Sequence, residues 1–203
     1  MALLATAPVA AHARMPKGAR LEPQTEAVRQ VDGISSQIVD NVWSATDHYW
    51  HKGDYNRIIA LVRVCVEAEP DFTEAWEDAA WLLWSQGDTA AADALLKDAV
   101  ARNPKNWDLY HELGWHLFRT KRYAQALPYL KRATEMPDTP SMPWKALAHC
   151  YDKMGRLDDS IRIWKIVVMR YPKDGVGPIN LARVQAKQKL GAQKTTKQPN
   201  DAL

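Results

Sequence analysis

The sequence predicts an all-α protein in which pairs of helices repeat along the chain as a solenoid. Two observations predict it: apolar residues return every three or four positions through residues 73–104, and matching residues recur 34 positions apart. Within residues 73–104 the apolar periodicity is interrupted at Gly87-Asp88 and stops at Asn103-Pro104. Glycine favours a helix C-terminus, aspartate a helix N-cap, and proline ends a helix. Residues 73–104 are therefore two helices joined by a tight turn.

The 34-residue spacing holds for five series of residues. One such series could arise by chance, but five in register indicate a helix–turn–helix repeat that is present four times. The series are Gly53, Gly87, Lys121 and Gly155; Trp76, Tyr110 and Trp144; Ala80, Gly114 and Ala148; Tyr49, Leu83, Leu117 and Tyr151; and Pro70, Pro104, Asp138 and Pro172.

The period, the marker residues and their order resemble the tetratricopeptide repeat (TPR) family over roughly residues 39–172. The resemblance implies a right-handed superhelical solenoid of four TPR helix pairs within residues 35–172, at approximately 39–72, 73–106, 107–140 and 141–174. The family's small residues, which allow close helix crossing, correspond to Ala80, Gly114 and Ala148 in the first helices and to Ala92, Ala126 and Ser160 in the second. Its bulky second-helix residue corresponds to Val62, Leu96, Leu130 and Trp164. The first repeat is the least regular, as terminal repeats often are.

The segments outside the repeats are predicted from composition. Residues 1–13 end in an Ala-His-Ala sequence after an apolar run, which resembles the end of a secretory signal peptide, although no basic n-region precedes it. We therefore expect a periplasmic or secreted protein, with a cytoplasmic alanine-rich tail as the alternative. Residues 14–34 are expected to be a linker with a short helical piece at 26–30, after which the first repeat helix begins near Ile34 or Ser35. Residues 177–191 are expected to form a capping helix, and residues 192–203 a disordered polar tail.

The third repeat carries two local irregularities. Lys121 replaces the glycine of the inter-helix turn, so this turn cannot rely on a glycine in the left-handed conformation. Pro128 falls inside the second helix and removes one backbone donor, which predicts a mild kink.

Composition excludes several classes of protein. The net charge of +3 is too small to indicate nucleic acid binding, and no apolar stretch is long enough to span a bilayer. The two cysteines lie in different repeats, which argues against a disulfide and favours core positions for both. Neither His48 with His51, nor His111 with His149, has a convincing third metal ligand. No nucleophile elbow or phosphate-binding loop is present, so we expect no enzymatic activity, no metal and no cofactor.

The candidate binding face follows from helical geometry. In the first helix of each repeat, positions 4, 7, 8 and 11 carry the signature and must pack, whereas positions 2, 5, 9, 12 and 13 cluster nearly opposite. In the TPR family this second side lines a concave groove. Here it is aromatic and partly acidic, with five of nine tryptophans. The predicted partner-binding residues are Trp43, Asp47, Trp50, Glu74, Glu77, Trp81, Trp84, Asp108, His111, Trp115, Phe118, Lys145 and His149. Trp76, Trp144 and Trp164 are assigned to the core.

This face predicts a non-enzymatic protein–protein interaction module, a scaffold or adaptor that binds a polypeptide in the groove. The acids favour a partner with basic residues and disfavour nucleic acid. The lysine and asparagine set with which some family members bind a C-terminal carboxylate is not matched at these positions. Two alternatives stay open: an envelope protein that binds a small molecule or glycan on the aromatic rings, and a structural assembly component in which the rings pack on one another. The sequence does not indicate the oligomeric state.

Overall fold

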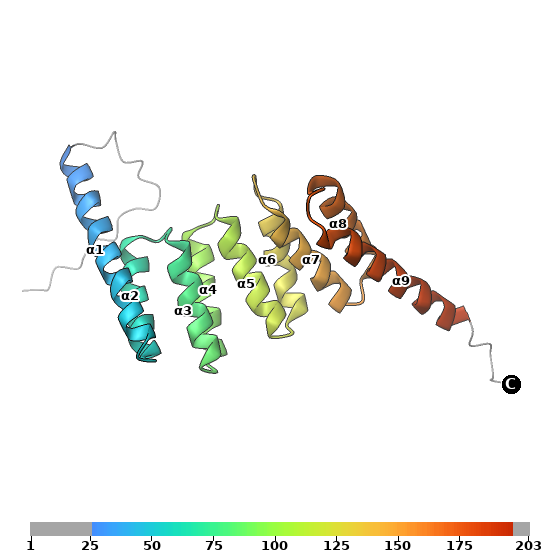
Figure 1. Ribbon diagram of the computed structural model, residues 1–203, viewed down its shortest axis with the longest axis horizontal. Coiled ribbons are helices and arrows are strands. Elements are labelled where there is room, and N and C mark those ends of the chain that lie inside the picture. Colours follow the sequence, from blue (N-terminus) through green and yellow to red (C-terminus); the bar gives the residue numbers. More distant parts are fainter. Residues whose placement is uncertain (1–25, 197–203) are drawn as a thin grey trace, which may run out of the picture.

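The computed structural model describes residues 26–196, and all regular secondary structure in that range is α-helical. Figure 1 shows the helices following one another along an elongated molecule, with α1 at one end and α9 at the other. The helices of this range are α1 (Glu26–Trp50), α2 (Tyr55–Ala68), α3 (Thr73–Ser85), α4 (Thr89–Arg102), α5 (Trp107–Arg119), α6 (Tyr123–Thr134), α7 (Ser141–Lys153), α8 (Leu157–Arg170) and α9 (Val176–Thr196).

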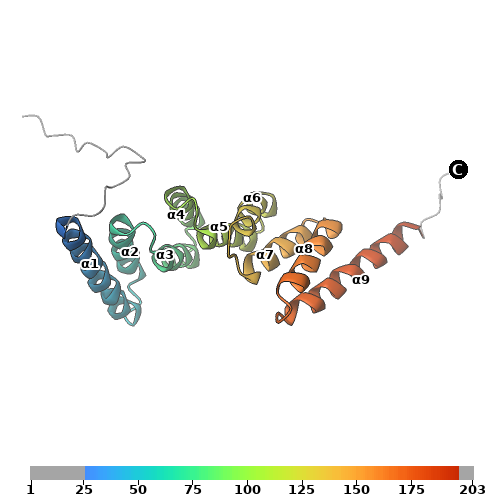
Figure 2. The same ribbon diagram turned by 90° about the horizontal axis from the view of Figure 1, so that it is seen from above.

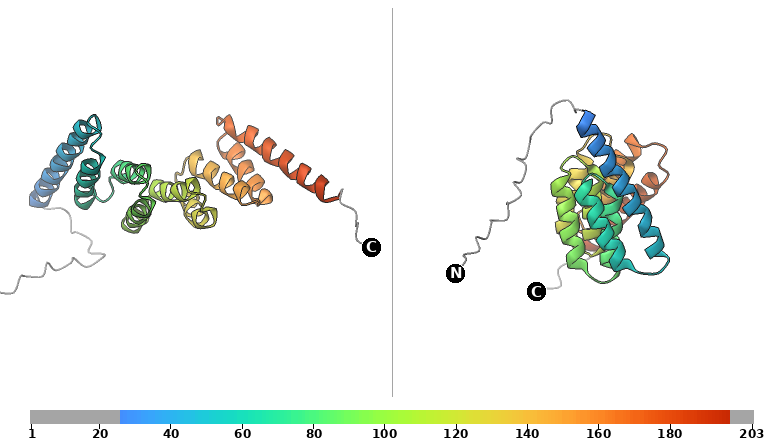
Figure 3. Two further views of the ribbon diagram at one scale, coloured as in Figure 1. Left: turned by 90° about the horizontal axis from the view of Figure 1, so that it is seen from below. Right: turned by 90° about the vertical axis from the view of Figure 1, so that its left-hand side faces the viewer.

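The helices pack as four successive pairs, α1 with α2, α3 with α4, α5 with α6 and α7 with α8, and α9 packs against α8. We call α1, α3, α5 and α7 the A helices and their partners the B helices. Each B helix also contacts the A helix of the next pair, and α5 contacts both α3 and α7. Views from two further directions show the same linear stack (Figures 2 and 3). The predicted solenoid of four helix pairs with a closing helix is confirmed.

The turns inside the pairs follow from their residues. Gly53, Gly87 and Gly155 have φ angles of 68°, 88° and 75°, in the left-handed region that glycine enters without a steric penalty. Asp88 is the N-cap of α4, as predicted, and accepts a hydrogen bond from the Ala91 N–H at 2.9 Å. In the third pair Lys121 takes the same left-handed conformation, with φ of 61°. The turn geometry is therefore kept without the glycine.

The core is formed by the series of residues that recur every 34 positions. Val62, Leu96, Leu130 and Trp164 are fully buried, as are the small residues of the A helices. Trp76 and Trp164 lie in the core as predicted, whereas Trp144 is half-buried and carries the Arg170 guanidinium over its ring. Cys65 and Cys150 are both buried free thiols.

The two ends of the array differ from the expected boundaries. Helix α1 begins at Glu26, so residues 26–34 of the expected linker are helical, and α9 continues to Thr196 through the start of the expected tail. Gly33 and Gly191 lie inside these helices, where a glycine lowers stability by only about 1 kcal/mol and does not force an end. The predicted signal peptide at residues 1–13 lies outside the described residues. Between residues 26 and 196, no helix combines the length and apolarity that crossing a membrane requires.

Helix α9 is held to the fourth pair by an apolar and an ionic contact. Val184 is fully buried, and the Asp152 carboxylate on α7, itself only 5% exposed, accepts hydrogen bonds from Lys187 Nζ at 2.6 Å and from Arg183 Nη2 at 2.9 Å. Burial opposes ionisation of Asp152, but the bonds from the two cations outweigh it and lower the pKa of this carboxyl. The cap helix therefore supplies the counter-charges of a buried acid.

Candidate functional site

The candidate site lies on the A-helix face, which we define as the side of α1, α3, α5 and α7 that carries positions 2, 5, 6, 9 and 12 of each repeat. Two hollows lie on it. The central pocket encloses about 500 Å³ between α3, α5 and α7, and the N-terminal pocket encloses about 390 Å³ between α1 and α3. Both volumes fall within the range of about 300–1,000 Å³ that is usual for ligand sites.

The central pocket is built from equivalent positions of successive repeats. Helix α5 contributes positions 2, 5, 6 and 9, which lie on one face because they are three or four residues apart. Helix α7 contributes the same four positions 34 residues later, and α3 contributes position 5. The lining residues are Glu77, Asp108, His111, Glu112, Trp115, Met142, Lys145, Ala146 and His149.

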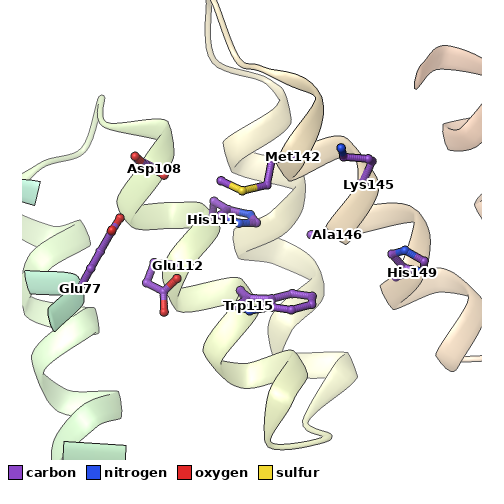
Figure 4. Close-up of a pocket in the computed structure, with 9 residues that line it drawn as sticks. All are labelled: Glu77, Asp108, His111, Glu112, Trp115, Met142, Lys145, Ala146 and His149. Atoms are coloured by element: carbon purple, nitrogen blue, oxygen red, sulfur yellow. The ribbon is translucent and has the colours of Figure 1, made fainter. Parts of the chain in front are cut away.

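The charges in the central pocket are separated between its two sides. Figure 4 shows the carboxylates of Glu77, Asp108 and Glu112 on the side of α3 and α5, and Lys145 and His149 on α7. Lys145 is already paired, because its Nζ donates to Asp174 Oδ2 at 2.7 Å. Glu112 receives one bond, from Arg119 Nη2 at 3.1 Å. The acidic side therefore has more negative charge than its own cations neutralise.

Burial and mutual repulsion make these acids hard to ionise. Burial, reinforced by the nearby Asp108, Glu112, Glu74 and Asp78 carboxylates, raises the pKa of Glu77 to about 7. Burial also raises the pKa of Glu112 to about 7, although Arg119 opposes the shift. The pKa of Asp108 is raised by burial and by Glu74. The pocket thus changes its charge near neutral pH.

His111 lies at the centre of the pocket and is neutral at physiological pH. Its ring is 6% exposed, and burial lowers its pKa to about 4. Its Nδ1 atom is buried and has no hydrogen-bond partner. On the other side of the pocket, burial lowers the pKa of His149, whose ring lies edge-on to Trp164 with centroids 5.0 Å apart.

The N-terminal pocket is open and aromatic. It is lined by Trp43, Ser44, Thr46, Asp47, Trp50 and Asp78. Trp50 is 45% exposed and stacks on Trp81, which is 43% exposed, with ring centroids 6.1 Å apart. These two rings bridge α1 and α3 and still present large apolar surface to solvent.

The other predicted aromatic residues are partly packed. Trp115 stacks on Phe118 with centroids 5.0 Å apart, and both rings are half-buried. The Arg119 guanidinium lies over the half-buried Trp84 ring at 4.7 Å. Of the predicted stripe, Trp50 and Trp81 are therefore its most exposed members.

The structure brings most of the predicted site residues together. Six of them line the central pocket, and Trp43, Asp47 and Trp50 line the N-terminal pocket. Trp81 stacks on Trp50, Phe118 stacks on Trp115, and the Arg119 guanidinium lies over Trp84. Glu74 is exposed beside Glu77. The sequence reasoning missed Glu112, Met142 and Ala146, and Ser44, Thr46 and Asp78 in the second hollow. Position 6 was the available signal, since it supplies Ser44, Asp78, Glu112 and Ala146.

No group of three or more His, Cys, Asp or Glu side chains between residues 26 and 196 is arranged to hold an ion. His51 instead lies beside Asp47, with Nε2 and Oδ1 3.5 Å apart. The A-helix face offers apolar rings, hydrogen-bond acceptors and negative charge.

Comparisons with known proteins agree with the repeat structure. The tetratricopeptide repeat model matches residues 77–143. No curated protein sequence matches the chain. Among solved structures, a MamA protein from Desulfovibrio magneticus RS-1 is 17% identical, with a TM-score of 0.60 over 79% of this chain and 92% of that one. Pseudomonas aeruginosa pilF is 18% identical, with a TM-score of 0.61 over 76% and 71%. YrrB, described as a TPR protein with an unusual peptide-binding site, is 20% identical, with a TM-score of 0.56 over 73% and 76%.

The fold and the face define a helical repeat protein of the kind that supports protein–protein interaction. The sequence match identifies residues 77–143 as tetratricopeptide repeats, and the solved structures share the fold of the helix array. At identities of 17–20% the solved structures establish the fold of this chain and leave its partner open.

Proposed function

We propose that this protein is a non-enzymatic scaffold or adaptor that binds a polypeptide segment along the A-helix face. The observation that carries the proposal is the pair of exposed, stacked rings of Trp50 and Trp81 on the same face as the acidic central pocket. Clustered apolar surface of this kind marks interaction sites on soluble proteins, and tryptophan is enriched among the residues that dominate binding energy.

In the proposed mechanism the aromatic rings bind apolar side chains and the acidic residues select basic ones. Apolar side chains of the polypeptide pack on the rings of Trp43, Trp50 and Trp81 on α1 and α3, and on Trp115 in the central pocket. The excess negative charge on α3 and α5 favours segments that carry lysine or arginine, by charge complementarity. YrrB, with its peptide-binding site, shares this fold and lends general support to a polypeptide as the ligand.

The test selects ligands from a displayed random peptide library and measures their affinities by calorimetry. We expect the Trp50→Ala/Trp81→Ala variant to bind the selected peptides at least about 30-fold more weakly, since a residue that dominates an interface contributes about 2 kcal/mol or more. A Met169→Ala/Ile179→Ala variant is the matched control, because these residues are 73% and 71% exposed on α8 and α9, away from the A-helix face. It should bind like the wild type.

Two results would contradict the proposal. One is equal binding by the wild type and the Trp50→Ala/Trp81→Ala variant, with circular dichroism showing both folded, which would place the binding surface elsewhere. The other is a library that yields no peptide while a glycan array yields a ligand that quenches tryptophan fluorescence. That result would favour the aromatic rings as carbohydrate-stacking surfaces.

A further inference from the structure

We propose that the central pocket is the subsite for one lysine or arginine side chain of the bound polypeptide. Tighter binding above neutral pH than below is an expected consequence. The inference rests on the proposed function and specifies its main determinant of selectivity. It concerns the acidic side of the pocket, formed by Glu77, Asp108 and Glu112.

The first argument is that two of these carboxylates lack partners. Neither Glu77 nor the side chain of Asp108 has a hydrogen bond or ion pair within residues 26–196. Other half-buried or buried acids of the array are paired. Asp93 is bonded to Arg122, with Nη2 and Oδ1 2.7 Å apart, and Asp152 is bonded to Lys187 at 2.6 Å. A pair of partly buried carboxylates without a cation is unusual in this molecule, and a cationic ligand would complete it.

The second, independent argument is His111. This residue is more than nine-tenths buried and lines the same pocket, yet its Nδ1 atom has no partner. A buried ring nitrogen without a hydrogen bond is destabilising, and an N–H group of a ligand would satisfy it as an acceptor. Figure 4 shows the Met142 side chain beside this ring, and Met142 is 46% exposed, so one neighbour of the ring is a flexible side chain.

The remaining wall suits the rest of a basic side chain. Trp115, Met142 and Ala146 form an apolar surface along which a chain of methylene groups can lie. Lys145 does not occupy this position, because Asp174 holds its ammonium group at 2.7 Å.

The pH dependence follows from the carboxyl groups. Without ligand, burial and the neighbouring acids raise the pKa values of Glu77 and Glu112 to about 7. A bound cation favours the ionised forms and lowers both pKa values, so binding releases protons near and below pH 7. Affinity is therefore highest above pH 7 and falls as the pH decreases, by up to about tenfold per pH unit for each coupled carboxyl.

The other charged groups around the pocket do not reverse this sign. His111 is already neutral, because burial lowers its pKa to about 4. The pKa of His149 is lowered by burial, so its protonation at lower pH adds positive charge and weakens cation binding in the same direction. The ionisable groups that line the pocket are Glu77 on α3; Asp108, His111 and Glu112 on α5; and Lys145 and His149 on α7. Glu74 and Asp78 act on Glu77, and Arg119 is bonded to Glu112.

The experiment titrates the full chain with N-acetyl-lysinamide and N-acetyl-argininamide and follows the Trp115 indole N–H by NMR. N-acetyl-norleucinamide, which has a side chain similar in length to lysine but no charge, is the matched probe. We expect saturable shifts with one or both cationic probes at pH 8, an apparent Kd at least about fivefold higher at pH 6, and no saturable shift with the norleucine probe.

Variants separate the pocket from general attraction to acids. Glu77→Gln and Asp108→Asn should each weaken the cationic probe several-fold at pH 8, whereas Asp98→Asn, an exposed change on α4, should leave binding unchanged. Equal shifts from the norleucine probe, or an affinity that does not respond to Glu77→Gln, would overturn the inference. Either result leaves the proposed function standing if the selected peptides still need Trp50 and Trp81. Loss of peptide binding with intact cation binding would have the opposite meaning.

Discussion

At the scale of single residues, the ionised Glu77 side chain of the central pocket destabilises the folded protein. Its carboxylate is partly buried beside Asp108 and Glu112 and has no cation of its own among the described residues. Carboxyl groups with strongly shifted pKa values are concentrated at functional sites, where a ligand can compensate the unfavourable electrostatic energy, and they therefore mark candidate sites. Stability measurements can detect this cost without any knowledge of the ligand.

Replacing Glu77 with glutamine should stabilise the protein at high pH and not at low pH. The folded-state pKa of about 7 lies above the unfolded value of about 4.5, so the folded protein is favoured when the group is protonated. That contribution is complete below the unfolded pKa and is lost as the pH rises through 7. Because the side chain is partly exposed, we expect Glu77→Gln to raise the free energy of unfolding by only about 1 kcal/mol at pH 8, which corresponds to a rise of about 2–4 °C in Tm.

The measurement is a thermal melt of the wild type and Glu77→Gln at pH 5 and pH 8. The two proteins should melt at nearly the same temperature at pH 5 and separate at pH 8. Asp40→Asn removes an exposed carboxylate of α1 and is the matched control, with no comparable separation expected. A Glu77→Gln variant that is less stable than the wild type at pH 8 would show that the carboxylate is stabilised in the folded state.

Residue-level prediction from the sequence worked where the 34-residue register decides the outcome. Glu77, His111 and Lys145 occupy position 5 of three repeats, and all three line the central pocket. Glu112 was missed because position 6 lies at the margin between the packed side and the open side of a helix. Whether such a residue faces a hollow depends on how closely the next A helix approaches, which the periodicity of one helix does not contain.

At the scale of helices, close approach depends on single small residues. Gly114 on α5 is the clearest case, because a Cβ atom there would lie 2.7 Å from Leu130 Cγ and 3.1 Å from the Leu130 backbone nitrogen. Contacts below 3.0 Å force a neighbour to shift, and the backbone of α6 has little room to do so. Gly33 on α1 has nothing within 4 Å of the equivalent position.

Alanine substitutions at these two glycines should therefore have opposite effects. Gly114→Ala should lower the free energy of unfolding by about 1–2 kcal/mol, since overpacking exceeds the gain in helix propensity. Gly33→Ala should raise it by about 0.5–1 kcal/mol, because the helix gains propensity and nothing clashes. Urea denaturation followed by circular dichroism measures both. A stabilised Gly114→Ala variant would mean that α5 and α6 can separate without loss of packing.

Other glycines show which helix boundaries the sequence could predict. Gly87, with φ of 88°, does end its helix and was interpreted correctly, whereas Gly33 and Gly191 lie within helices. A glycine permits the left-handed conformation but does not impose it. The choice depends on whether a following helix must fold back, and α2 does so only after Gly53. Helix α1 is therefore longer than the register of the repeats predicted.

At the scale of the whole molecule, stability is a sum of units and of the contacts between neighbours. Helix α9 closes the array, and its Arg183 and Lys187 side chains neutralise the buried Asp152 carboxylate of α7. Removing both cations leaves that carboxylate without its counter-charges. The fourth pair should then become the weakest unit, while the second and third pairs keep their own contacts.

In an Arg183→Gln/Lys187→Gln variant the free energy of unfolding should fall by about 1–3 kcal/mol. This is less than the usual loss of about 3–5 kcal/mol for a broken buried pair, because both cations are about half exposed. Hydrogen exchange should show the loss in α7, α8 and α9, with α3 and α5 protected as in the wild type. Lys189→Gln, an exposed change on the same helix, provides the reference. Uniform loss of protection along the chain would show that the array unfolds as one cooperative unit.

The construction of the central pocket makes the order of the repeats part of its chemistry. Its acids come from the second and third units, and its Met142 and Lys145 from the fourth. No single unit contains the site, so exchanging two units would separate the groups that meet there. The proposed selectivity therefore depends on the order of the units as well as on the sequence of each one.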